Sequence, residues 1–388
     1  MDETAIDPET AGPRRIPLAD IVRYFLRLGA LGFGGPVALC GQMQRELVED
    51  RAWLTRAEMR EAIAVSQSLP GPLAIQVGIF AAYMRGGFWG AWAGGWAFIL
   101  PNFLFVAALG ALYVHFGGLP WMTAVFYGVS PVVIALILHS CWRLSKLGME
   151  HWLQWLIAAV AFFVTVVFKA EVAVLFLCAG AVGVVYWGTV FRRRGPPTLS
   201  LAFAAPSAIG KLVVFFLKAG SLTFGSGLVI VPFLEKGLVQ ESHWLSPRDF
   251  LIAVAIGMMS PGPVVITATF VGFLVAGFWG SLASTVAIFL PSFVLVLAVA
   301  PLLRRHRDNP NVQGFIKGTY GAAIGTILGA CVLLGKVAIG DALTGLIAVV
   351  ALGLLFRFKI ANPILIAAAA IVGLIAFPWL KPAWVMIR

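Results

Sequence analysis

The chain has 388 residues, of which 60% are hydrophobic and only 12% charged, with a formal net charge of +11. A soluble globular domain carries roughly 25% charged residues, so this composition excludes an ordinary soluble protein. A basic excess of this kind is typical of the cytoplasmic loops of membrane proteins, and we expect a lipid bilayer and no nucleic acid among the partners.

The apolar part of the chain begins after a polar tail of mixed charge at 1–20, which lacks the apolar core of a signal peptide. No acidic residue, lysine or arginine occurs between Arg85 and Arg143, or between Asp249 and Arg304. A helix needs about 20 apolar residues to cross a bilayer, so each stretch has room for two crossings. The sequence therefore predicts an all-α polytopic membrane protein.

The first half contains a Gly-interrupted helix, a polar connection, a Pro-broken helix and four apolar segments. The Gly interruption is LGFGGP at 31–36, which includes Gly34 and Gly35. The Pro break is SQSLPGPLAIQ at 66–76. The four apolar segments that follow are predicted at about 87–114, 120–142, 151–168 and 171–191.

The second half repeats the first in the same order. The corresponding pairs include Phe33-Gly34 with Phe224-Gly225, Trp53-Leu54 with Trp244-Leu245, and Pro70-Gly71-Pro72 with Pro261-Gly262-Pro263. LPNF at 100–103 likewise corresponds to LPSF at 290–293. We therefore divide the chain into the tail 1–20, a first membrane repeat 21–195 and a second membrane repeat 206–388, with apolar segments at about 279–303, 315–335, 342–356 and 361–380.

Loop charges indicate that the two repeats have opposite orientations. Loop 115–119 has no lysine or arginine, whereas its counterpart contains three arginines at 304–307. Basic loops stay in the cytoplasm, so equivalent loops of opposite charge predict inverted-topology repeats. Inversion requires an odd number of crossings, about five in each half. The Gly-interrupted and Pro-broken elements are therefore predicted to cross once together, with one of them re-entrant.

The Pro-Gly-Pro breaks predict an anion site. Pro70 and Pro72 supply no N–H, so the carbonyls of Ser66 and Ser68 should lose their helical partners. The half-helix that restarts at Leu73 directs free N–H groups into the gap, and Val264 begins the equivalent half-helix after Pro261, Gly262 and Pro263. A bilayer tolerates such a break only beside a cavity or inside protein. The alternative is a simple kink.

Further candidates flank these breaks. The Gly stretches, with Gly34 and Gly35 in the first half and Gly225, Ser226 and Gly227 in the second, either let backbone approach the anion or serve close helix packing. Arg27 and Lys218 are equivalent; they either attract the anion or anchor the helix at the interface. The acidic candidates for proton coupling are Glu46, Glu235, Glu58 and Asp249, and the alternative for each is a solvated loop carboxylate.

Motifs for catalysis are absent from the sequence, which has no metal-ligand spacing, no GxSxG and no phosphate-binding Gly-Lys loop. We therefore expect a secondary or passive transporter without cofactor or metal, and not an enzyme. A membrane-embedded enzyme acting on lipids is the alternative of another class, but it would need clustered His, Asp or Glu at membrane depth.

The quoted motifs resemble those of the chromate ion transporter family of prokaryotes in its long two-domain form. The resemblance rests on GFGGP at 32–36, QMQRELVEDRAWL at 42–54, LPGP at 69–72, FLPSF at 289–293 and the second-half FGSG and SPGP. It implies efflux of chromate across the inner membrane and chromate resistance. Sulfate or another small oxyanion, moved with protons, is the alternative substrate. The oligomeric state is left open, with a homodimer as one arrangement.

Overall fold

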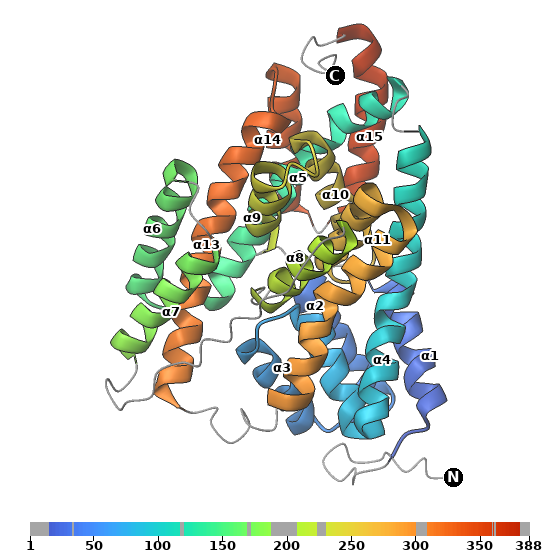
Figure 1. Cartoon of the computed structure of the whole chain (residues 1–388), viewed down its shortest axis with the longest axis vertical. Helices are drawn as coiled ribbons and strands as arrows, with labels where there is room; N and C mark the ends of the chain where they lie inside the picture. The colour runs from blue at the N-terminus through green and yellow to red at the C-terminus, as the bar shows by residue number, and fades with distance from the viewer. Residues whose placement is uncertain are drawn as a thin grey trace.

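The computed structural model describes residues 15–32, 35–116, 120–168, 172–187, 208–222, 230–299, 309–358, 360 and 362–380. The described elements are helices, and no strand occurs among these residues (Figure 1). The all-α prediction is therefore confirmed.

The first two helices form a hairpin. Helix α1 (Leu18–Leu31) is followed by α2 (Gly35–Gln44), which continues as the π-helical turn η1 (Arg45–Asp50). The buried side chains of α1 include Ile21, Phe25 and Leu28, spaced to form one apolar stripe. This stripe packs against α4.

A second hairpin surrounds the first Pro-Gly-Pro break. Helix α3 (Arg56–Ser68) starts with a capping box between Thr55 and Glu58 and ends just before the break. Helix α4 (Leu73–Phe116) starts directly after it.

Helix α4 reverses direction at Gly87, whose backbone angles are φ 62° and ψ −153°. Only glycine adopts this conformation readily, and the helix divides there into a short and a long arm. The arms pack antiparallel, because Gly78 lies against Phe98 and Gly94 lies against Ala82. The 44 residues of α4 are therefore a helical hairpin and not one continuous span.

Three further helices complete the first half: α5 (Pro120–Gly148), α6 (Trp152–Phe168) and α7 (Val172–Trp187). They agree with the predicted apolar segments to within a few residues.

The second half has the same order of elements. Its first part consists of α8 (Ala208–Leu222), α9 (Ile230–Glu235), η3 (Lys236–Glu241), α10 (Pro247–Met259), η4 (Val264–Ile266), α11 (Thr267–Val294) and η5 (Leu295–Val299). The last part is α13 (Pro310–Ala338), α14 (Ala342–Arg357) and α15 (Asn362–Leu380). Gly277 has the same backbone angles as Gly87, φ 62° and ψ −153°, and reverses α11 in the same way.

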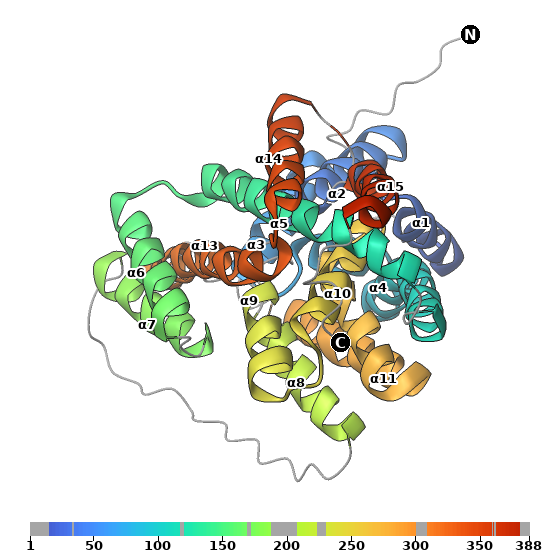
Figure 2. The same cartoon turned by 90° about the horizontal axis from the view of Figure 1, so that it is seen from above.

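The long arms of α4 and α11 run antiparallel, as inverted repeats require. The rings of Trp92 and Phe293 are 4.9 Å apart, and those of Phe103 and Phe278 are 6.0 Å apart, so the order of contacts along one arm is reversed along the other. Helices of one repeat also pack against helices of the other: α13 packs against α6 and α7, and α5 packs against α14 and α15 (Figure 2). The two sequence repeats are thus interleaved in space.

The elements before Gly87 meet at one end of the first half. The N–H of Ile16 donates to the carbonyl of Arg85 at 3.2 Å, and the Arg85 side chain donates to the carbonyl of Trp53. The start of α1, the connection before α3 and the end of the short arm of α4 therefore lie side by side. Both the Gly-interrupted and the Pro-broken elements are hairpins that return to this common base, and that they cross the membrane once together stays a prediction.

Several described helices are apolar enough to cross a membrane. Apolar helical stretches of sufficient length cover Thr123–Lys146 and Gln313–Ala338, and also Leu73–Phe116 and Val264–Ala298, which contain the reversals at Gly87 and Gly277. Shorter apolar helices cover Trp152–Val167, Leu175–Trp187, Ala342–Arg357 and Asn362–Phe377. Large apolar side chains lie exposed on them, such as Trp89, Trp279 and Val349 at 72%, 68% and 69% exposure. Such surfaces suit lipid and not water, in agreement with a polytopic membrane protein.

Candidate functional site

The first break is held open by a side chain. Gly71 has φ 138°, a value that favours glycine. The carbonyl oxygen of Pro70 accepts a hydrogen bond of 2.6 Å from Gln76 Nε2. The carbonyl of Ser66 regains a partner, because the N–H of Leu69 donates to it at 3.3 Å. The Ser66 carbonyl has therefore lost its usual helical partner as predicted, and a tighter turn at the end of α3 replaces the missing bond.

The short arm of α4 starts with amides that have no acceptor in their own helix. Its first intrahelical bond runs from the N–H of Gln76 to the carbonyl of Pro72, at 3.1 Å. The N–H groups of Leu73, Ala74 and Ile75 precede that bond, and their side chains are buried. The positive end of the helix dipole therefore lies inside the protein at the break.

The second break has the same shape with different details. Gly262 has φ 97°, and a single 3₁₀ turn starts at Val264, with the N–H of Ile266 donating to the carbonyl of Pro263 at 3.1 Å. Thr267, which corresponds to Gln76, donates only to the carbonyl of Val264, at 2.8 Å. The second break therefore lacks the side-chain bond that spans the first.

A backbone hydrogen bond connects the two halves at the second break. The N–H of Gly262 donates to the carbonyl of Gly32 at 2.8 Å. Gly32 ends α1 and belongs to the first-half Gly stretch. The tip of the α1–α2 hairpin of one half thus meets the Pro-Gly-Pro break of the other.

Sequence reasoning missed two polar residues beside the breaks. A methyl group placed on Gly262 would lie 2.3 Å from Asn102 Nδ2, and one placed on Gly71 would lie 2.7 Å from Ser292 Oγ. Asn102 and Ser292 occupy equivalent positions in LPNF and LPSF, and both are fully buried. A polar residue after proline at the same place in both repeats is the signal that could have identified them.

Arg27 and Glu46 form an ion pair. Arg27 Nη2 lies 3.6 Å from Glu46 Oε1, and Gln42 Nε2 donates to the same oxygen at 2.9 Å. The Glu46 carboxylate is buried, whereas Arg27 is exposed. In the second half, Glu235 accepts bonds from Gln240 Nε2 at 2.9 and 2.8 Å, and Lys218 Nζ lies 6.0 Å from the centre of the Phe233 ring.

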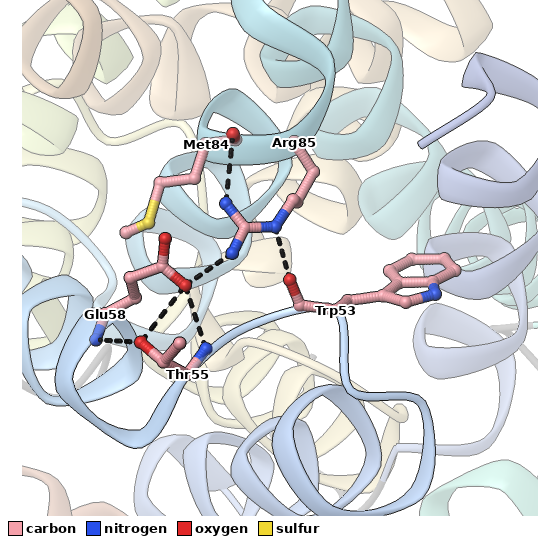
Figure 3. Close-up of polar contacts among 5 residues, drawn as sticks. All are labelled: Trp53, Thr55, Glu58, Met84 and Arg85. Carbon is pink, nitrogen blue, oxygen red and sulfur yellow. Dashed lines mark hydrogen bonds and ion pairs between the residues drawn. The ribbon is translucent and has the colours of Figure 1, made fainter. Parts of the chain in front are cut away.

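Glu58 belongs to the base of the hairpins and not to the breaks. It pairs with the buried guanidinium of Arg85 and accepts bonds from the Thr55 N–H at 2.8 Å and hydroxyl at 3.2 Å (Figure 3). Partial burial raises the pKa of Glu58, but the Arg85 and Thr55 donors together outweigh it, and the pKa is lower than its ordinary value. These contacts favour a structural role for the carboxylate.

Asp249, the equivalent of Glu58, has neutral partners. Tyr113 donates its hydroxyl to Asp249 Oδ1 at 2.7 Å, and Ser246 donates to Oδ2 at 2.7 Å. Tyr113 lies on the long arm of α4, so this bond also joins the two halves.

Some predicted residues lie outside the described part of the chain, namely Gly34, Gly225, Ser226 and Gly227. Gly35 is the first residue of α2. Among the described residues, no group of three or more His, Cys, Asp or Glu side chains could hold a metal ion.

Comparison with known proteins identifies the family. The sequence profile described as Chromate transporter matches the chain twice, over residues 19–184 and 210–374. The chain belongs to the chromate transporter family. One match covers most of each half of the chain, so each half of this family member resembles the family profile separately.

Named relatives extend along most of the chain. It is 45% identical over 378 residues to the chromate transport protein of Cupriavidus metallidurans, covering 94% of each chain. It is 43% identical over 374 residues to the probable chromate transport protein of Synechococcus elongatus, covering 92% of this chain and 95% of the relative. A chromate transport protein of Pseudomonas aeruginosa is 31% identical over 399 residues, covering 95% and 94%. No solved structure matches this chromate transporter family member.

Proposed function

We propose that this chain exports chromate across the cytoplasmic membrane, and that the two Pro-Gly-Pro breaks form its anion site. The observation that carries the proposal is the contact between the halves at the second break, where the N–H of Gly262 donates to the carbonyl of Gly32 at the end of α1. The half-helices that start at Leu73 and Val264 both begin inside the protein, and their N–H groups suit an anion with several acceptor oxygens. The names of the relatives support chromate as the substrate.

The membrane potential is sufficient to drive export. One charge moving through 100 mV is worth about 2.3 kcal/mol, so a dianion leaving an inside-negative cell gains roughly 4.6 kcal/mol for the same potential. This corresponds to a concentration ratio on the order of a thousandfold or more. Export therefore needs neither ATP nor a coupled ion.

Proton coupling is the alternative, and Glu46 is the carboxylate best placed for it. Its side chain is buried, it pairs with Arg27, and it follows the Gly stretch. Proton-coupled uptake would suit sulfate, a tetrahedral dianion like chromate, because inward movement of such an anion opposes the membrane potential.

The experiment is counterflow of labelled chromate and labelled sulfate in proteoliposomes, with voltage and pH gradients set independently. We expect chromate to move toward the positive side when only a voltage is applied. Sulfate flux that follows a pH gradient, with no chromate flux in response to voltage, would contradict the proposal and favour proton-coupled uptake.

A further inference from the structure

Three buried polar side chains at the breaks are not fully paired. Gln76, Asn102 and Ser292 each have 0% exposure. Each keeps a polar atom without a hydrogen-bond partner in the described structure, namely Gln76 Oε1, Asn102 Oδ1 and Ser292 Oγ. Buried polar groups are normally paired, because an unpaired one loses its bonds to water and gains nothing. Of the three atoms, only Ser292 Oγ can donate to an anion. The amide oxygens of Gln76 and Asn102 are acceptors, so these two residues can bind an anion only through their N–H groups.

Gln76 and Ser292 lie beside Gly71 of the first break, and Asn102 lies beside Gly262 of the second. A methyl group on Gly71 would lie 2.2 Å from Gln76 Nε2 and 2.7 Å from Ser292 Oγ, and one on Gly262 would lie 2.3 Å from Asn102 Nδ2. Ser292 belongs to the second half and approaches the break of the first, and Asn102 does the reverse. Each break is therefore completed by the long arm of the opposite half.

Donor capacity is left over at each of these groups. A side-chain amide nitrogen carries two N–H bonds. Gln76 Nε2 uses one on the carbonyl of Pro70, at 2.6 Å, and Asn102 Nδ2 uses one on the carbonyl of Gly29, at 3.2 Å. One N–H of each amide and the hydroxyl of Ser292 are then available to an acceptor.

Neutral donors suit an anion that has to leave again. Hydrogen bonds to a charged oxygen are strong in a buried site, whereas a buried cationic side chain would hold a dianion so tightly that its release would be slow. Conduction requires binding that permits both entry and exit. The uncharged amides and hydroxyl, together with the backbone N–H groups of the half-helices, meet this requirement.

We infer that Gln76, Asn102 and Ser292 are the side-chain ligands of a tetrahedral oxyanion bound between the breaks. The assignment rests on the proposed function, in which the breaks form the anion site. It adds donors from both halves, so that neither repeat contains a complete site alone.

The test is binding and transport of chromate and of sulfate by Asn102→Asp and Ser292→Ala in proteoliposomes, from about pH 5 to 8. An aspartate at this fully buried position should change its charge in that range, because burial raises the pKa of a carboxyl group above its ordinary value. Thr326→Ala is the control, because Thr326 is equally buried but bonds to the carbonyl of Ala323 in its own helix. We expect Ser292→Ala to weaken binding about tenfold, as loss of one bond to a charged group does. Asn102→Asp should weaken it about 100-fold at high pH and recover in part at low pH, when the new carboxyl is neutral. Thr326→Ala should bind normally.

The outcomes separate the two proposals. If the wild-type protein binds sulfate and not chromate, chromate export is wrong, and the same variants test the ligands with sulfate. The ligand assignment is wrong if wild-type protein binds either anion and two further results are found. Ser292→Ala would bind that anion as tightly as wild type, and Asn102→Asp would be either inactive at every pH or unaffected. If Asn102→Asp does not fold, Ser292→Ala alone decides. Wild-type protein that binds neither anion would overturn both.

Discussion

Arg85 has no charged counterpart in the second half, where Val275 occupies the equivalent position before the turn glycine. Its buried guanidinium joins Glu58 to the carbonyl of Trp53, and so fixes the base of the first-half hairpins. In the second half, the uncharged hydroxyl of Tyr113 donates a hydrogen bond to Asp249 instead. The two equivalent carboxylates therefore fix the same end of the hairpins in different ways, Glu58 by an ion pair and Asp249 by a hydrogen bond from a tyrosine.

Glu58→Gln should destabilise the folded protein by about 2–3 kcal/mol at neutral pH, because it leaves the Arg85 charge buried without its carboxylate. The pKa of Glu58 is lower in the folded protein than in the unfolded chain. The ionised carboxylate therefore stabilises the fold fully above the unfolded pKa of about 4.3, and this stabilisation is lost as the pH falls through the lower folded pKa. Unfolding in detergent, followed at several pH values, measures this. The difference in the free energy of unfolding between wild type and Glu58→Gln should become smaller at acidic pH.

The double variant Glu58→Gln/Arg85→Met is the matched control. It removes both charges, so it should be more stable than the sum of the two single changes predicts. Additive losses, or a Glu58→Gln loss that does not depend on pH, would contradict the ion-pair account. Transport per folded molecule should keep its pH dependence in Glu58→Gln.

Glu46→Gln tests coupling at the other carboxylate. The change keeps the size of the side chain and removes its charge. If Glu46 carries a coupling proton, the pH dependence of chromate transport should flatten, whereas export driven by voltage alone predicts an unchanged pH profile. We expect the unchanged profile, measured as initial flux at fixed voltage, and a flattened one would favour proton coupling.

Arg27→Gln tests attraction of the anion. If Arg27 attracts it, the apparent half-saturation constant for chromate should rise severalfold while the maximal rate changes little. Because Arg27 also pairs with the buried Glu46 at 3.6 Å, Arg27→Gln/Glu46→Gln is the control that removes the pair without an unbalanced charge. Less folded protein with an unchanged half-saturation constant would instead support anchoring of the helix.

At the scale of the element, the reversals at Gly87 and Gly277 determine the shape of each half. Both glycines have φ 62° and ψ −153°, and a methyl group on either would meet nothing within 4 Å. An alanine at either position would therefore lower the stability only through its unfavourable backbone conformation, and not through a steric clash. Gly87→Ala and Gly277→Ala should each destabilise the protein by about 1–3 kcal/mol.

The matched control is Gly353→Ala in α14, where the added methyl also meets nothing within 4 Å. The backbone of Gly353 is helical, so alanine should be neutral or stabilising there. Thermal unfolding of the three variants in detergent distinguishes the two cases. Equal stability of Gly87→Ala and Gly353→Ala would show that the chain does not need the reversal.

The sequence could predict the breaks but not their surroundings. Proline chemistry is local, so Pro70, Pro72 and their repeat equivalents determine where the helices end. Arg85, Gly86 and Gly87 mark the start of the apolar segment predicted at 87–114. The sequence does not show, however, that the chain reverses there into an antiparallel hairpin. Asn102 and Ser292 reach the breaks only through contacts between the halves, and sequence spacing within one half carries no information on such contacts.

For the whole molecule, inversion predicts the accessibility of helix ends. The long arm of α4 ends at Phe116, and α13, which follows the long arm of α11, begins at Pro310. Because the two long arms run antiparallel, we expect Phe116 and Pro310 on opposite sides of the membrane. Single cysteines at His115 and Asn309, introduced after the four native cysteines are replaced, should react with impermeant reagent from opposite faces of sealed vesicles. Labelling of both from the same face would contradict inverted repeats.

The central claim is that the two Pro-Gly-Pro breaks together bind the anion, and chromate binding by Pro70→Ala/Pro72→Ala and by Pro261→Ala/Pro263→Ala tests it most directly. Alanine lets the helix continue, so its backbone N–H groups become occupied by carbonyls and are lost to the anion. We predict that each double variant inserts at normal or higher stability and that its affinity for chromate falls at least about tenfold. A well-inserted double variant that binds chromate with wild-type affinity would show that the breaks are hinges or packing features and that the anion binds elsewhere.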